Sequence, residues 1–124
     1  MTPFSAIFVP DELRAALSDG AWLAAMLDAE RALAAAQAAA GAIGPDAAAA
    51  VAGACDPALY DTDALAVEGR AAGNPVVPLV EAVRARVGEE HAADVHRGAT
   101  SQDILDSAAM LVARNGLSLI HRDL

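Results

Sequence analysis

The sequence predicts an all-α fold, and three observations lead to that prediction. Apolar residues recur at helical spacing, as they do over 76–87, and no segment shows the alternation that is typical of strands. Alanine, the residue with the highest helix propensity, supplies much of the 56% of residues that are hydrophobic. Glycine or proline separates successive apolar stretches, where helices commonly end or begin. We therefore expect helices that pack closely through small side chains around a thin core.

The N-terminal segment is expected to contain an arm and a short helix. Residues 1–9 should form an extended arm with an apolar face that docks on other protein. That face consists of Phe4, Ile7 and Phe8. A short helix should follow from Pro10 to about Leu17, because proline fits the first helical turn and the acids after it suit the helix dipole.

One long helix is expected over residues 21–40. Ser18 offers a cap before it, and Gly41 stands where a glycine commonly ends a helix. Glu30 and Arg31 interrupt its apolar background. We expect both side chains to be solvated or paired with a neighbour on the helix. A buried Glu30 that contacts another segment is the alternative.

Three shorter helices should follow, at about 44–54, 62–72 and 76–87. Thr62 is a plausible cap for the second of them. Gly73-Asn74-Pro75 separates the last two, because glycine and asparagine tolerate a positive φ and proline cannot continue a helix. Residues 89–99 form the longest polar connection, and loops of that length often carry a function.

The composition limits the partners and the compartment of the protein. The formal net charge is −9 and lysine is absent, which argues against non-specific binding to nucleic acid or to an anionic membrane. We find no apolar run long enough to span a membrane and no basic leader segment. The single cysteine, Cys55, excludes an intramolecular disulfide and favours a cytoplasmic location. We interpret Cys55 as a small buried residue rather than a nucleophile.

The densest group of polar side chains is the stretch 96–103, which reads His-Arg-Gly-Ala-Thr-Ser-Gln-Asp. Thr100 and Ser101 stand where a cap hydroxyl belongs, and Asp103 suits the first turn of the helix that follows. A helix N-terminus presents free backbone N–H groups to an anion. Two hydroxyls, an imidazole and an arginine beside it favour a carboxylate or a phosphate as the ligand. The alternative is a plain helix cap.

A metal site is the weaker interpretation of the polar loop. Its candidate ligands are Glu90, His91, Asp94 and His96, but their spacing matches no known ligand motif, so no metal is expected. The sequence also lacks a phosphate-binding glycine loop, a paired-cysteine site and a nucleophile elbow. Helical signals continue to Leu124, and we expect the chain to be a piece that is cut within a long helix.

The stretch from His96 to Asp106 resembles the first signature region of the fumarase/aspartase superfamily. Two other segments support the resemblance. Residues 22–37 and the turn at 41–45 resemble the N-terminal helix of the family and the turn that follows it. Residues 73–80 resemble the segment before the signature in the cycloisomerase branch. The resemblance covers nearly the whole chain and favours the 3-carboxy-cis,cis-muconate cycloisomerases, with adenylosuccinate lyase or another superfamily lyase as the alternative.

The resemblance implies the N-terminal all-helical domain of the fumarase/aspartase fold over residues 1–98. Residues 99–124 would then be the signature loop and the truncated start of the central helical bundle. It also implies a homotetramer whose active sites are each assembled from three subunits, with no cofactor and no metal. The later signature regions lie beyond Leu124, so we expect the chain alone to be inactive.

The chemistry that the resemblance implies is the addition of a substrate carboxylate across a double bond. In the favoured branch, 3-carboxy-cis,cis-muconate closes to 4-carboxymuconolactone, a step in the protocatechuate branch of aromatic degradation. The ligand would thus be a small polycarboxylate, and neither nucleic acid nor a membrane would be a partner.

The resemblance also assigns roles to residues. The substrate-binding residues would be His96, Arg97, Thr100, Ser101 and Gln102. The residues that support the site structurally would be Gly98, Asp103 and Asn74. The role of Arg97 as a second anion contact is a hypothesis, because its position varies across the family. A different class of function is also open, a helical association domain in which Thr100 and Ser101 form only a cap.

Overall fold

The computed structural model describes residues 4–124, and over that range the chain is helical and contains no strand. The prediction of an all-α fold is therefore confirmed. The α-helices are α1 (Ser5–Phe8), α2 (Asp11–Ala16), α3 (Asp19–Ala39), α4 (Pro45–Ala54), α5 (Thr62–Ala72), α6 (Val76–Val87) and α7 (Ser101–Arg122). Two short 3₁₀-helices lie between them, η1 (Pro57–Leu59) and η2 (Ala92–Asp94).

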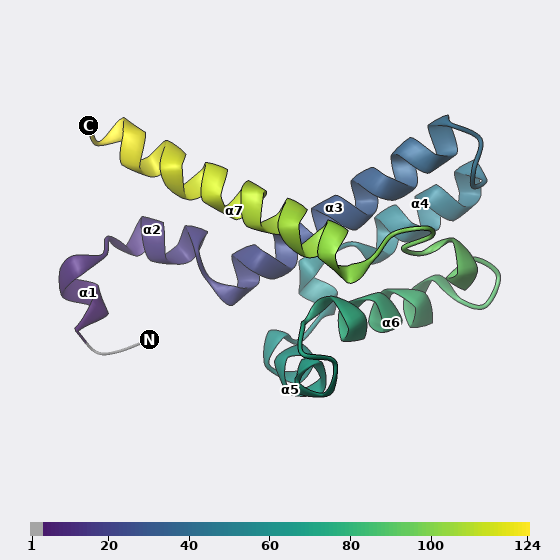
Figure 1. Cartoon of the computed structure of the whole chain (residues 1–124), viewed down its shortest axis with the longest axis horizontal. Helices are drawn as coiled ribbons and strands as arrows, with labels where there is room; N and C mark the ends of the chain where they lie inside the picture. The colour runs from purple at the N-terminus through teal and green to yellow at the C-terminus, as the bar shows by residue number, and fades with distance from the viewer. Residues whose placement is uncertain (1–3) are drawn as a thin grey trace.

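The most extensive contacts between elements are those of helix α3 with α7 and with α4. Helix α4 returns along α3 after a short turn, and α7 crosses α3 (Figure 1). Helices α5 and α6 pack on each other below this pair, and α6 also contacts α4 and α7. Helix α2 lies beside the C-terminal part of α7, so segments from opposite ends of the chain are neighbours.

The helix ends follow local chemistry. The Ser18 hydroxyl accepts a hydrogen bond from the backbone N–H of Ala21 at 3.2 Å, as expected of the cap of α3. Gly41 adopts a φ of +75°, which a residue with a side chain rarely adopts, and it ends that helix. The cap of α5 was assigned to Thr62, and this is wrong by one residue. The carboxylate of Asp61 accepts from the N–H groups of Asp63 and Ala64 and leaves Thr62 inside the helix.

The core is thin, and alanine forms a large part of it. The largest fully buried apolar side chains are Leu27, Leu79, Val51, Val76, Val83 and Val95. The buried alanines are Ala25 and Ala34 on α3, Ala47 and Ala54 on α4, and Ala108 on α7. A methyl group keeps two helices close together and removes little area from water. The helices around α3 therefore lie close together, but each alanine contact between them buries little apolar area.

The extended arm expected at the N-terminus is wrong in its described part. Residues Ser5–Phe8 form one helical turn, in which the N–H of Val9 donates to the carbonyl of Ser5 at 2.9 Å, and no proline interrupts it. Residues 1–3 lie outside the described residues. The apolar face of this segment remains mostly exposed, with exposed fractions of 68% for Phe4, 69% for Ile7 and 80% for Phe8.

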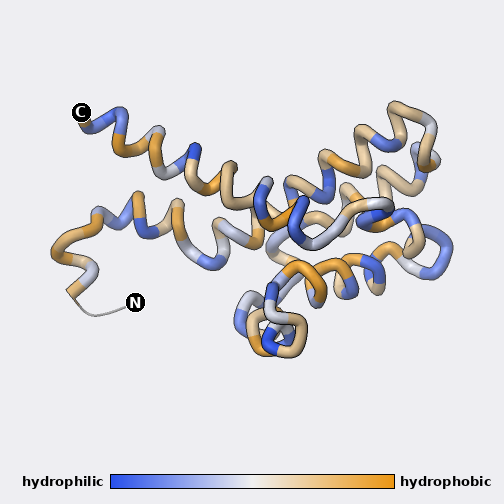
Figure 2. The backbone as a smooth tube through the Cα atoms, viewed as in Figure 1, coloured by the Kyte–Doolittle hydropathy of each residue, from blue (hydrophilic) through white to orange (hydrophobic). Residues whose placement is uncertain are grey.

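Helix α7 has two apolar sides with different surroundings. One side is buried and repeats every four residues: Ile104, Ala108, Val112 and Gly116. The other side leaves Met110, Leu117 and Ile120 exposed. Figure 2 shows hydrophobic positions along the whole of α7, including the C-terminal part that lies beside α2. Within residues 4–124, no helix is both long enough and apolar enough to cross a membrane.

Candidate functional site

The stretch singled out by its polar residues is a tight loop that leads into α7. Two of its residues have left-handed backbone, His96 with a φ of +58° and Gly98 with a φ of +72°. This conformation suits glycine, whereas a histidine adopts it only where its surroundings favour it. The N–H of Ala99 donates to the carbonyl of His96 at 3.3 Å and closes the turn. Gly98 therefore supplies a backbone conformation that this turn requires.

Thr100 is the N-cap of α7 and is paired with Asp103. The backbone N–H of Thr100 donates to a carboxylate oxygen of Asp103 at 2.8 Å, and its hydroxyl approaches the same oxygen at 3.3 Å. The two residues form a capping box, so Asp103 supports the start of the helix. The Thr100 hydroxyl already has a partner in its own helix turn.

Ser101 and Gln102 occupy the first two positions of α7. Their backbone N–H groups make no hydrogen bond within residues 4–124, as is usual at a helix start. The Ser101 hydroxyl is likewise without a partner among the described residues, and its side chain is partly exposed. The Gln102 amide instead donates to Asp106, one turn further along, at 2.5 Å. The free donors at this helix start are thus two N–H groups and one hydroxyl.

Arg97 fastens the loop to the turn between α3 and α4. Its guanidinium donates to the carbonyl of Ala42 at 3.0 Å and to the carboxylate of Asp94 at 3.2 Å. From the opposite direction, the Gln37 amide on α3 donates to the carbonyl of Arg97 at 2.6 Å. Half of the Arg97 side chain stays exposed, so it could still face an anion.

The expectation that Glu30 is solvated is wrong, and the alternative of a buried contact holds. Glu30 is 1% exposed, and its carboxylate lies 2.5 Å from Nδ1 of His96, 66 residues away. Burial raises the pKa of Glu30, while the hydrogen bond to His96 and the charges of His96 and Arg84 act in the opposite direction. Arg31, the neighbour of Glu30, behaves as expected and pairs with Asp28.

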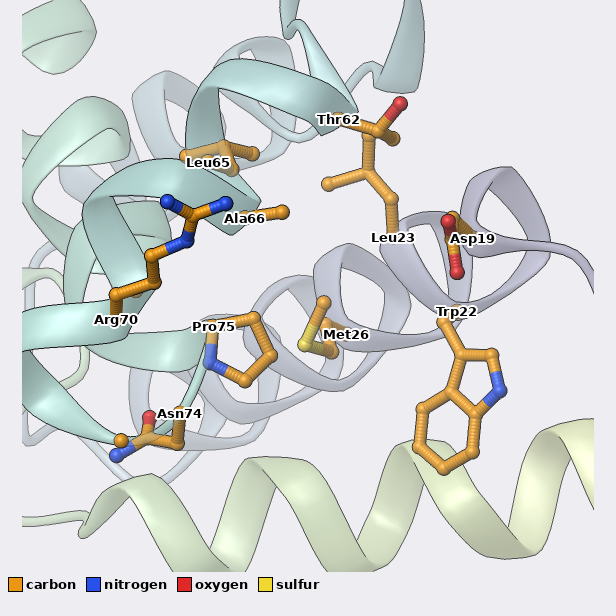
Figure 3. Close-up of a pocket in the computed structure, with 12 residues that line it drawn as sticks. Asp19, Trp22, Leu23, Met26, Thr62, Leu65, Ala66, Arg70, Asn74 and Pro75 are labelled. Carbon is orange, nitrogen blue, oxygen red and sulfur yellow. The ribbon is translucent and has the colours of Figure 1, made fainter.

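Asn74 stands in the turn between α5 and α6. Its side-chain oxygen accepts from the N–H groups of Val76 at 3.0 Å and Val77 at 3.3 Å, the first two of α6. Asn74 also lines a cavity of about 550 Å³ between α3 and α5. Figure 3 shows Arg70 and Pro75 on one side of that cavity, Leu23 and Trp22 on the other, and Met26 between them.

A second cavity, a groove of about 860 Å³, runs between α3 and α7. Arg97, Gly98 and Asp103 line it together with Gln37 and Arg114. Thr100, Ser101 and Gln102 are not part of its lining. The predicted site residues therefore lie in four places: the buried contact of His96, the start of α7, the cavity that Asn74 lines, and the groove that Arg97 lines.

Two candidates from the sequence remain, a metal site in the polar loop and the thiol of Cys55. Among residues 4–124, no group of three or more histidine, cysteine or acidic side chains is arranged to hold a metal ion. Cys55 is fully buried, as we expected of a small core residue, and burial raises the pKa of its thiol to about 11.

Sequence reasoning offered a buried Glu30 without identifying the loop as its partner, and it missed the contact of Gln37 with the loop. Glu30 and Gln37 are seven residues apart on α3, which places them on one side of that helix, and both contact the loop at His96 and Arg97. The available signal was a pair of polar residues at helical spacing in an alanine background. That signal shows which face they share but not which segment lies against it.

Comparison with known proteins finds similar lyases and cycloisomerases. No family model matches the chain. The chain is 51% identical over 115 residues to a nitrosuccinate lyase of Streptomyces davaonensis, in an alignment that covers 90% of the chain and 24% of the relative. It is 44% identical over 124 residues to a 3-carboxy-cis,cis-muconate cycloisomerase of Pseudomonas aeruginosa, covering 98% of the chain and 27% of the relative.

Solved structures agree with these sequences. The 3-carboxy-cis,cis-muconate lactonizing enzyme from Pseudomonas putida superposes with a TM-score of 0.92 at 43% identity, over 98% of this chain and 28% of that one. A fumarate lyase from Mesorhizobium sp. BNC1 superposes with a TM-score of 0.85 at 38% identity, over 93% of this chain and 27% of that one. The chain has the fold of the N-terminal helical part of these enzymes, and it spans about a quarter of their length.

Proposed function

We propose that this chain is the N-terminal segment of a fumarase/aspartase-superfamily enzyme, a cycloisomerase that converts 3-carboxy-cis,cis-muconate to 4-carboxymuconolactone. The observation that carries the proposal is the match in both sequence and fold over nearly the whole chain to enzymes that are named for this substrate. We also propose the division expected from the sequence, with a helical domain over 1–98 and the start of a central bundle over 99–124.

The start of α7 is the part of the site that this chain would contribute. The free N–H groups of Ser101 and Gln102 and the Ser101 hydroxyl point to an anion as the ligand, because the positive end of a helix dipole adds to their attraction. A substrate carboxylate accepts several hydrogen bonds at once. Thr100 and Asp103 would hold the helix start in shape through the capping box.

The same donors suit the reaction. When a carboxylate adds to the double bond, negative charge develops on the neighbouring carboxyl group before a proton is delivered. Donors fixed by the fold stabilise such charge without first reorganising, and this is often the largest contribution to catalysis. His96 would contact the substrate through the ring nitrogen that Glu30 does not occupy, and Arg97 would add positive charge nearby.

Oligomer and location complete the proposal. We propose a homotetramer with shared active sites, supported by the apolar residues that α1 and α7 leave exposed, among them Phe8, Met110 and Leu117. We propose a cytoplasmic enzyme that acts on a small polycarboxylate. The 124-residue chain by itself should show no turnover, because it would hold only part of each active site.

A citrate titration of the chain tests the anion site. Citrate should slow amide hydrogen exchange over 89–103 and shift the amide resonances of Ser101 and Gln102. Ser101→Ala should weaken this binding about tenfold or more, the factor that corresponds to a hydrogen bond with a charged group. Ser118→Ala is the matched control, since its hydroxyl bonds to the Arg114 carbonyl within the same helix. An unchanged response in Ser101→Ala would contradict the site.

A stand-alone association domain predicts a different result. Citrate would then have no effect on the loop, and Thr100→Ala would cost only about 1 kcal/mol of stability, as the loss of a helix cap does. Measurement of both quantities on the same samples separates an anion site from a plain cap.

A lyase is the second candidate function, and the 51% identity to a nitrosuccinate lyase favours it. Both reactions handle a polycarboxylate, so the helix start would serve either one. Assays of the enzyme that contains this segment on 3-carboxy-cis,cis-muconate, nitrosuccinate and adenylosuccinate distinguish them. Lactone formation supports the first proposal, while elimination from nitrosuccinate or adenylosuccinate without lactone formation would replace it.

A further inference from the structure

Glu30 is the one buried charged residue among the described residues, and its placement needs an explanation. It lies on α3 between Ala29 and Arg31 and is 1% exposed. Moving a carboxylate out of water is costly unless it gains strong partners. Only one of its two oxygens has a partner within residues 4–124, because Oε2 is buried without a hydrogen bond. An alanine here would remove the buried charge, so stability alone does not explain a glutamate.

His96, the partner of Glu30, is also largely buried and has a constrained backbone. The His96 ring is 11% exposed, and its Nδ1 lies 2.5 Å from Oε1 of Glu30. The backbone of His96 is left-handed, which is uncommon for histidine. Two turns along α3, Gln37 donates to the carbonyl of the next residue, Arg97. Helix α3 thus contacts two successive loop residues. Glu30 contacts the ring of His96, and Gln37 contacts the backbone of Arg97.

Oε1 of Glu30 lies where it can accept from an Nδ1–H of His96. Burial raises the pKa of Glu30, while His96 from the loop and Arg84 of α6 act against that larger effect. The thiol of Cys55, which follows α4, also faces Glu30, and burial keeps it neutral below about pH 11. A carboxylate on Nδ1 fixes both the tautomer and the direction of an imidazole ring.

We propose that Glu30 is a positioning residue of the carboxylate site: it holds His96 through Nδ1, so that Nε2 is the ring nitrogen that meets the ligand. This inference rests on the proposed function for the site itself. It adds that the orientation of His96 is set from α3, by a residue that never touches the ligand.

The tautomer of His96 tests the proposal without any ligand and without any substitution. Long-range proton–nitrogen NMR spectra of the chain should show a proton on Nδ1 of His96 that exchanges slowly with water. His91 and His121 serve as internal references in the same spectrum. A wild-type spectrum in which the His96 proton resides only on Nε2 would overturn the proposal, whatever the variants do.

Three variants then separate positioning from mere support of the fold. Glu30→Ala should abolish the slow Nδ1 proton and weaken citrate binding about tenfold or more, the factor of one charge-assisted hydrogen bond. Glu30→Gln keeps an acceptor at the same place and should restore the tautomer. Gln37→Ala is the matched control, because it releases the Arg97 backbone and should leave the His96 tautomer unchanged. Citrate affinity equal to wild type in a folded Glu30→Ala would overturn the proposal.

The two proposals fail in different ways. If citrate leaves the Ser101 and Gln102 amides of the wild type unmoved, the proposed function fails even where the His96 tautomer is as expected. If citrate binds the wild type but the tautomer of His96 does not depend on Glu30, the function stands and the positioning role is wrong.

Discussion

The Glu12 carboxylate and the Arg122 guanidinium form a two-point ion pair across 110 positions of the chain, with nitrogen–oxygen distances of 2.8 and 3.1 Å. This pair joins α2 to the last turn of α7. Parallel hydrogen bonds between arginine and a carboxylate fix direction as well as distance. The start of the described chain is thereby fastened along the helix that carries the proposed site.

Loss of this ion pair should loosen α2 without unfolding the protein. The Arg122 hydrogen bond and charge lower the pKa of Glu12, so the contribution of the pair is present above the unfolded pKa and is lost as pH falls through the folded one. Both side chains are more than half exposed, which keeps the effect local. Arg122→Gln should raise amide exchange in α2 at pH 7 and leave the melting temperature unchanged. Protection of α2 equal to that of the wild type would contradict this.

A methyl group on Gly69 should be destabilising. A Cβ atom there would stand 3.0 Å from the carbonyl oxygen of Asn74, which is backbone and cannot rotate away. We expect Gly69→Ala to cost about 1–3 kcal/mol by overpacking. Gly53→Ala is the matched control, since no atom lies within 4 Å of its added Cβ and helix propensity favours alanine by up to about 1 kcal/mol. Chemical denaturation measures the free energy of unfolding of both variants. If Gly69→Ala is as stable as Gly53→Ala, the close contact at Gly69 is refuted.

Truncation of Leu27 should reveal how well the thin core is packed. Leu27 is fully buried on α3, so Leu27→Ala leaves a cavity and should cost about 2–5 kcal/mol. Val67→Ala on α5 provides the comparison, because Val67 is 57% exposed and its loss should matter little. If alanine-lined neighbours collapse into the space, the measured free energy of unfolding will lie at the low end of that range.

The Cys55 thiol should react only when the fold opens. It is fully buried, and burial raises its pKa to about 11. Because the thiolate is the reactive form, a thiol reagent at pH 8 should modify the folded chain far more slowly than the chain in denaturant. The raised pKa favours folding below the unfolded value of 9.0, and this contribution is lost as pH rises through about 11. Rapid modification of the native chain would contradict the burial.

Much of the helical framework could be predicted from local sequence. Gly41 and Gly73 end helices because their positive φ is available to glycine, and such signals need no knowledge of the fold. It is harder to decide which of two neighbouring residues caps a helix when both side chains can do so. Asp61 and Thr62 can both cap a helix, and the choice between them depended on how the chain arrives there.

The environment of the candidate site was less accessible to sequence reasoning. Whether Glu30 is solvated or buried depends on a histidine 66 residues away, and periodicity does not report such partners. The roles of Thr100 and Ser101 illustrate the same limit. Both were recognised as cap candidates, but only coordinates assign the cap to Thr100 and leave the hydroxyl of Ser101 without a partner in the described chain.

Buried alanines on α3 and α4 restrict which residues this pair of helices can accept. Ala34 and Ala47 are buried on two helices that contact each other, so the limit on a replacement side chain there is its volume rather than its hydrophobicity. Valine or leucine at either position would act as a wedge, whereas glycine or serine would fit. Saturation mutagenesis at these two positions should therefore find that polar residues of similar size are tolerated more readily than apolar residues with two or more additional carbon atoms.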